Sequence, residues 1–260
     1  MNSMPENFPD TGAGCADRHY LIRSEAEGDD IELRVGSIEG LPSVYITEES
    51  DVVEDVLIVV DGMQAPGNYP ALRASTVYTI YKVIGDLEAE VACIHCKALL
   101  KDKGSRQHYV VSVGRAYLPK VQILDAWREG VPVSWRDLDP VYGYPWISAC
   151  MSLASPFNWR QTLVTGLVVL DVAGLRTEDD LYCHLGEALF GYRGYAGSNL
   201  AAFEDVLRHN EPARITFSIP DEAEFDAFLA RTTRRSGHAG VFKQIIGEAG
   251  AALRIERRSA

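Results

Sequence analysis

The apolar residues of this chain follow two different patterns, which divide it near residue 160. In the first part, short runs rich in Val, Ile, Tyr and Thr are separated by turn-forming residues, as in β-proteins. We expect strands at residues 19–23, 31–35, 44–47, 56–60, 76–84, 89–95, 108–113 and 121–124. Because few runs have helical spacing, this pattern predicts a mainly-β domain over residues 18–160. The polar residues 1–17, which include Pro and Gly, predict a flexible tail.

Strands and helices alternate after residue 160. A largely apolar strand at Leu167–Val172 precedes a helix that Thr177 is expected to cap, with an acid three residues later. Further helices are expected over Asn199–Arg208, from Asp221 and over 241–248, and strands at 214–219 and 253–256. The order β-α-α-β-α-α-β predicts a small α/β layer over residues 161–260. The aromatic-rich segment 141–160 is interpreted as the last element of the first domain, followed by a packed linker.

The stretch from Tyr195 to Leu207 predicts a tight turn that leads into a helix. Gly197 can adopt a turn conformation that is closed to other residues, and Ser198 or Asn199 can cap the helix. Leu200, Phe203 and Leu207 then form one apolar face. The acidic pair Glu204 and Asp205 lies between these apolar positions, and Asp205 is expected to be exposed.

This stretch and the element order together resemble the barstar family of intracellular ribonuclease inhibitors. The segment Val168–Leu189 is similar without a gap to the family's first strand and helix. The motif Tyr-x-Gly-x-Asn-Leu, which begins at Tyr195, is similar to the loop before the family's second helix. The resemblance covers residues 161–260 and implies a barstar-like α/β domain, with a three-stranded parallel sheet packed with helices.

In this family the second helix and the loop before it block the active site of a ribonuclease. The resemblance therefore implies a ribonuclease as partner and an immunity-type role. It assigns partner binding to Tyr195, Gly197, Asn199, Glu204 and Asp205, with Asp205 as the key acid. The chain departs from the family pattern at three places: Ala201 replaces an acid, Glu204 replaces an aromatic residue, and a further acid on the last helix falls at Gln244 or Glu248.

The charge of the chain agrees with a cationic partner. The net charge is −12 and the sequence pI is about 5.0, which disfavours binding to nucleic acid. A ribonuclease active site holds Arg, Lys and His groups arranged for phosphate, and a fixed carboxylate can replace the phosphate there. Tyr195 is expected to add apolar contact area with a polar tip.

Membrane association and secretion are not expected from the sequence. No apolar run approaches the ~20 residues that span a bilayer, and the N-terminus lacks the pattern of a signal peptide. Cysteines occur in an odd number, five, which is typical of reduced thiols, so we expect a cytoplasmic protein.

No catalytic, cofactor or metal motif is evident, so we expect neither an enzyme nor a cofactor. The cluster Cys93-Ile94-His95-Cys96 lacks a second pair of zinc ligands and is interpreted as part of a buried strand. Asp61 places a carboxylate at the end of a strand, where a plain turn explains it equally well. Cys183 and His184 are expected to be structural, and the run 231–235 to be a solvated loop or the end of a helix.

An alternative function makes the C-terminal domain a structural or regulatory adaptor for a partner other than a ribonuclease. In that case the main ligand-binding activity lies in the N-terminal domain. The departures at Ala201 and Glu204 from the family pattern motivate this alternative.

Overall fold

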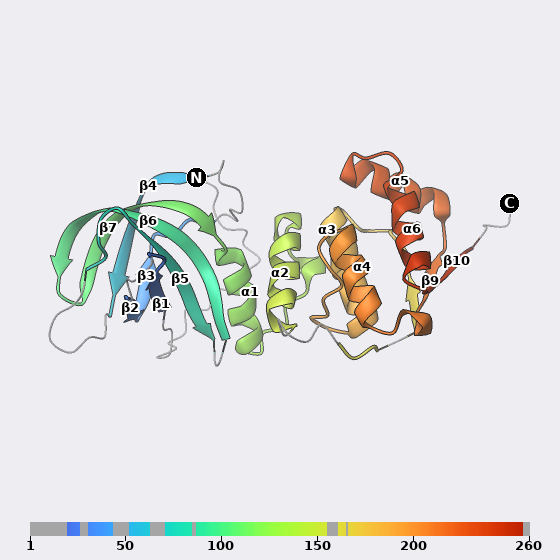
Figure 1. The fold of residues 1–260 in the computed structure, drawn as a ribbon, viewed down its shortest axis with the longest axis horizontal. Coiled ribbons are helices and arrows are strands. Elements are labelled where there is room, and N and C mark those ends of the chain that lie inside the picture. The colour runs from blue at the N-terminus through green and yellow to red at the C-terminus, as the bar shows by residue number, and fades with distance from the viewer. Residues whose placement is uncertain are drawn as a thin grey trace. The chain divides into compact units, whose positions relative to one another are not determined.

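The computed structural model describes residues 20–26, 31–43, 52–62, 71–84, 87–154, 161–164 and 166–256 (Figure 1). The chain forms two compact units, residues 1–133 and 134–260. The tail expected at residues 1–17 and the strand expected at 44–47 lie outside the described residues.

Seven of the described strands form one curled antiparallel sheet in the N-terminal unit (Figure 1). The sheet order is β2-β1-β5-β6-β7-β4-β3. One face carries the buried core side chains, among them Ile22, Tyr78, Ile80 and Ile94, because side chains alternate between the two faces of a strand. The expected mainly-β character of this region is confirmed. The strands are β1 (Tyr20–Ser24), β2 (Glu32–Val35), β3 (Ser37–Glu39), β4 (Val53–Asp61), β5 (Thr76–Ile84), β6 (Leu87–Lys103) and β7 (Arg106–Ala116).

Helix α1 (Leu118–Arg128) packs on β5 and β6 of this sheet. It contains residues 121–124, so the strand predicted there is wrong. A short apolar run cannot be assigned to a strand or a helix by periodicity alone. Two features decide the outcome here: Pro119 lies in the first turn, where proline favours a helix start, and Val121, Leu124 and Trp127 share a buried face.

The C-terminal unit contains a separate three-stranded parallel sheet among its described residues, in the order β10-β9-β8. Val168, Phe217 and Leu253 are neighbours in its register. The expected order of strands and helices is confirmed from β8 to β10. The elements are β8 (Leu167–Val169), α3 (Glu178–Phe190), α4 (Leu200–His209), β9 (Thr216–Ile219), α5 (Glu222–Thr233), α6 (His238–Glu248) and β10 (Ala252–Ile255), with a short 3₁₀ helix at Pro212–Arg214.

This unit begins before residue 161. Two short 3₁₀ helices, Trp135–Asp137 and Pro140–Tyr142, lead into helix α2 (Gly143–Leu153), which packs against α3. The sequence interpretation placed this segment with the N-terminal domain, whereas the compact units divide after Val133. That residues 18–160 and 161–260 have separate functions stays a prediction.

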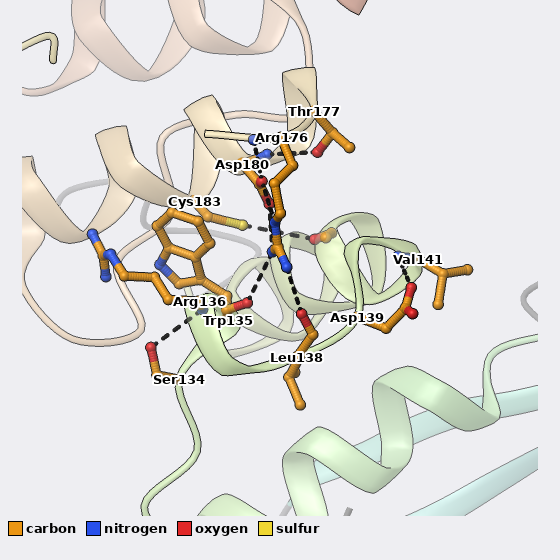
Figure 2. Close-up of polar contacts among 11 residues, drawn as sticks. Ser134, Trp135, Arg136, Leu138, Asp139, Val141, Arg176, Thr177, Asp180 and Cys183 are labelled. Carbon is orange, nitrogen blue, oxygen red and sulfur yellow. Dashed lines mark hydrogen bonds and ion pairs between the residues drawn. The ribbon is translucent and has the colours of Figure 1, made fainter. Parts of the chain in front are cut away.

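Arg176 forms an ion pair with Asp180 at the start of α3 and hydrogen bonds to the segment before α2 (Figure 2). The Nη1 group of Arg176 donates to the carbonyl oxygen of Leu138 at 2.7 Å, and its Nε donates to Oδ2 of Asp180 at 2.9 Å. Thr177 caps α3 as predicted, since its Oγ1 accepts from the backbone N–H of Asp180 at 3.1 Å. These contacts hold the start of α3 on the segment before α2.

Candidate protein-binding surface

Helix α4 starts at the loop that carries the Tyr-x-Gly-x-Asn-Leu motif, and Asn199 caps it. The Asn199 Oδ1 atom accepts a hydrogen bond from the backbone N–H of Ala202 at 3.0 Å. The backbone of Asn199 is extended, as expected for a capping residue. Of the two caps left open by the sequence, Ser198 and Asn199, the structure uses Asn199.

Gly197 brings the loop directly onto the first turn of α4. Its φ is +98°, a left-handed conformation that side chains disfavour. A Cβ atom at this position would lie 2.5 Å from the backbone nitrogen of Phe203 and 2.8 Å from the carbonyl carbon of Ala202. The prediction that only glycine fits this turn is confirmed.

Two further glycines, Gly186 of α3 and Gly194 of the loop, allow the same loop to approach α3 closely. A Cβ atom on Gly186 would lie 2.2 Å from the carbonyl oxygen of Gly194, and a Cβ atom on Gly194 would lie 2.2 Å from that of Gly186. The sequence analysis did not single out these residues. A signal was present, because glycine destabilises a helix interior, so Gly186 inside a helical pattern points to a packing reason.

The inner face of α4 is anchored by a cluster of phenylalanines. The ring of Phe203 stacks on Phe242 of α6 at 5.1 Å between centroids and meets Phe217 of β9 edge-on at 6.0 Å. Such pairs add about 0.5–1.5 kcal/mol each beyond their buried area. Phe203 and Leu207 are buried as predicted, whereas Leu200 is only half-buried.

The outer face of α4 presents the two acids differently. Asp205 is exposed, as predicted, and no described residue forms a hydrogen bond or ion pair with its carboxylate. Glu204 is partly buried, and its Oε1 accepts from the Nε of Arg208 at 3.0 Å. Asp205 is therefore the carboxylate of this helix that is open to a partner.

Helix α6 packs beside α4 and contributes a third acid. Glu204, by hydrogen bond and charge, raises the pKa of the Arg208 guanidinium, and Glu248 and Asp205 raise it further. Glu248 is exposed and accepts a hydrogen bond from Gln244 at 2.6 Å. Glu248 is the acid of the two positions, Gln244 and Glu248, and its charge acts on Arg208 of α4; which of the two matches the family's acid stays a prediction. Glu204, Asp205, Arg208 and Glu248 are called the α4–α6 surface below.

Tyr195 does not lie on this surface. Only 4% of the residue is exposed, and burial raises the pKa of its hydroxyl, against the opposing effect of a hydrogen bond with Ser198. The expectation that Tyr195 offers contact area to a partner does not fit this burial.

A cleft of about 830 Å³ opens beside the start of α4. Asn199 and Ala201 line one side, and Arg235 and His238, from the segment between α5 and α6 and the start of α6, line the other. The Nε2 of His238 lies 3.3 Å from the Oε1 of Glu178. Ala201, where the family pattern has an acid, is exposed at this cleft, so its small side chain leaves room there.

The other sequence candidates take structural positions. Cys93 and Cys96 lie on opposite faces of β6, since they pair with Thr79 and Thr76 of β5. Cys93 and Cys96 therefore cannot bind the same metal ion, and the described residues contain no group of three or more His, Cys, Asp or Glu suited to a metal ion. Asp61 ends β4, where its Oδ2 pairs with Nη1 of Arg106 at 2.9 Å.

The candidates in the C-terminal unit also have structural surroundings. Cys183 is buried and donates toward the carbonyl oxygen of Gly143, and the Nε2 of His184 lies 2.8 Å from the carbonyl oxygen of Val169. The run 231–235 ends α5, as predicted. None of the helices in the described ranges combines the length and the apolar character that a membrane crossing requires.

Comparison with known proteins adds no relative. No family model, curated protein sequence or solved structure matches the chain.

Proposed function

We propose that the C-terminal unit is a barstar-like inhibitor module that binds a ribonuclease through the α4–α6 surface. The observation that carries the proposal is the carboxylate of Asp205, which is exposed on a helix fixed by Asn199, Gly197 and the Phe203 cluster. A carboxylate held in this way can occupy the phosphate position of a cationic active site. The protein itself catalyses no reaction in this proposal.

The charges around Asp205 support a cationic partner. The α4–α6 surface holds three carboxylates and one guanidinium: Glu204 pairs with Arg208, and the charges of Glu248 and Asp205 also raise the pKa of Arg208, which leaves this set of groups negative. The whole chain carries a net charge of −12, which adds a long-range attraction for a basic protein. Complementary charge of this kind increases the rate of association and makes it sensitive to salt.

The test is inhibition of RNA cleavage by a panel of small, basic microbial ribonucleases in the presence of the full chain. We expect at least one to be inhibited, and Asp205→Ala to weaken that inhibition about thirtyfold or more, as for a central charged anchor. Glu224→Ala is the matched control, because Glu224 is an exposed acid on another helix, α5. The proposal fails if no ribonuclease is inhibited, and Asp205 has no part in it if both variants inhibit like the native chain.

The adaptor function remains the second candidate, because Arg208 neutralises part of the surface and Tyr195 is buried. It predicts that the full chain captures a protein other than a ribonuclease from its source cell. In that case Asp205→Ala would leave the capture unchanged, and mass spectrometry would identify the captured protein.

A further inference from the structure

Gln161 holds the loop before α4 by hydrogen bonds to its backbone. The Nε2 of Gln161 donates to the carbonyl oxygen of Tyr195 at 2.6 Å, and the backbone N–H of Tyr195 donates to the Oε1 of Gln161 at 2.9 Å. A single side chain thus satisfies both backbone groups of one loop residue. Sequence analysis gave no hint of this contact, because the two residues are 34 positions apart.

The same residue also holds the other end of α4. The backbone N–H of Gln161 donates to the Oδ1 of Asn210 at 2.9 Å. Asn210 is buried after the last turn, where its Nδ2 donates to the carbonyl oxygen of Val206 at 2.8 Å. Gln161 is therefore joined to the loop residue Tyr195 and to Asn210, which flank α4.

The chemistry of the contact requires a carboxamide. A glutamine side chain offers a donor and an acceptor on one planar group, as a neighbouring peptide bond does. A leucine of similar size offers neither, and an ionised glutamate offers only acceptors. Because Tyr195 and Ala196 are buried, a backbone group that loses its partner there has little access to water.

We infer that Gln161 is a positioning residue, which holds the loop and α4 in the conformation that displays Asp205; its consequence for ribonuclease binding rests on the proposed function. A surface that is ordered before the encounter avoids the entropy cost of ordering during binding. Gln161 precedes β8 and is separate from the α4–α6 surface in sequence, so it acts through Tyr195 and Asn210.

The first test needs no partner. Hydrogen exchange of the Tyr195 amide is measured by NMR in the full chain for native, Gln161→Leu, Gln161→Glu and the neighbouring control Thr162→Ala. We expect Gln161→Leu to accelerate exchange at Tyr195 about tenfold more than at α5 amides, because it removes the acceptor. Gln161→Glu keeps an acceptor and should retain most of the protection, and Thr162→Ala should retain all of it. Equal acceleration throughout the unit, or none at Tyr195, overturns the positioning role.

The second test asks whether the hydrogen bonds of Gln161 to Tyr195 affect binding of a ribonuclease. With a ribonuclease that the native chain inhibits, Gln161→Leu should weaken inhibition about tenfold, although Asp205 is unchanged. Unchanged inhibition together with faster exchange at Tyr195 overturns the role in binding. If the native chain inhibits no ribonuclease, the proposed function fails and its consequence for Gln161 fails with it. The exchange of Tyr195 still decides whether Gln161 holds the loop.

Discussion

The carboxylate of Asp180, whose side chain is fully buried, is held by the guanidinium of Arg176 through two hydrogen bonds, Nε–Oδ2 at 2.9 Å and Nη2–Oδ1 at 3.1 Å (Figure 2). The backbone N–H of Arg176 donates to the same carboxylate at 2.8 Å. The guanidinium also donates to the carbonyl oxygen of Leu138. The pair therefore joins the start of α3 to the segment that leads into α2.

Replacing Arg176 with alanine should destabilise the C-terminal unit strongly. The change leaves the buried carboxylate of Asp180 without its counter-ion, which typically costs about 3–5 kcal/mol. Urea unfolding followed by circular dichroism measures the loss. The control is Arg214→Ala, which removes the exposed pair with Glu211 and should cost about 0–1 kcal/mol. Similar losses for both variants would contradict the structural role of the buried pair.

Gly197→Ala should destabilise the protein more than Gly174→Ala. Both glycines have a positive φ, +98° and +84°, so both variants pay for a left-handed backbone. Only at Gly197 would the added Cβ collide with backbone atoms, whereas nothing lies within 4 Å of a Cβ at Gly174. We expect a difference of about 2 kcal/mol in the free energy of unfolding. Equal effects would show that the loop moves away from α4 without cost.

Asp179→Asn should stabilise the protein at neutral pH and lose this effect in acid. Burial, with the charges of Glu178 and Asp180, raises the pKa of Asp179 from 3.8 to about 6. Between pH 3.8 and about 6, Asp179 is therefore protonated in the folded state but ionised in the unfolded state. The loss of folding stability caused by the ionised carboxylate is complete above pH 6 and absent below pH 4. We expect a gain of about 1–2 kcal/mol at pH 7.5 that shrinks at pH 4.5, measured by urea unfolding. Glu224→Gln, an exposed control, should show no such trend.

Among the four cysteines in the described ranges, Cys93 should react first with an alkylating reagent. It is half-buried, whereas Cys96, Cys150 and Cys183 are buried. Burial raises the pKa of the Cys93 thiol, although a hydrogen bond with Arg115 opposes this, so its reaction should be slow at pH 7.5. Peptide mapping by mass spectrometry gives the order. Labelling of Cys150 or Cys183 as fast as Cys93, without urea, would contradict the burial of the α2–α3 contact.

Arg208→Ala should accelerate association with a basic ribonuclease, if the proposed function holds. The change removes the one cation among Glu204, Asp205 and Glu248 and makes the α4–α6 surface more negative. Complexes of the barstar family are themselves known cases of such steering, and here we expect only a several-fold effect, on the order of threefold at low salt. Stopped-flow mixing at two salt concentrations measures it. An effect that persists at high salt would point to contacts and not to charge.

The local features of the C-terminal unit follow from its sequence. The Asn199 cap, the turn at Gly197 and the buried side of α4 depend on contacts between residues a few positions apart, which leave a pattern in the chain. The exposure of Asp205 follows from the same helical spacing. In the N-terminal unit, short runs rich in Val, Ile, Tyr and Thr between turn-forming residues were enough to indicate most strands. This pattern failed at α1, where the short apolar run fits both kinds of element.

The tertiary structure alone decided how this surface is held and which groups it presents. Sequence spacing did not show that Tyr195 is buried, that Glu248 lies near Arg208, or that Gln161 joins Tyr195 to Asn210. It also did not place α2 with the C-terminal unit. Each of these depends on contacts between residues far apart in the chain. A hydrophobic period specifies which face of an element is buried, but the partner of that face is chosen only when all elements pack together.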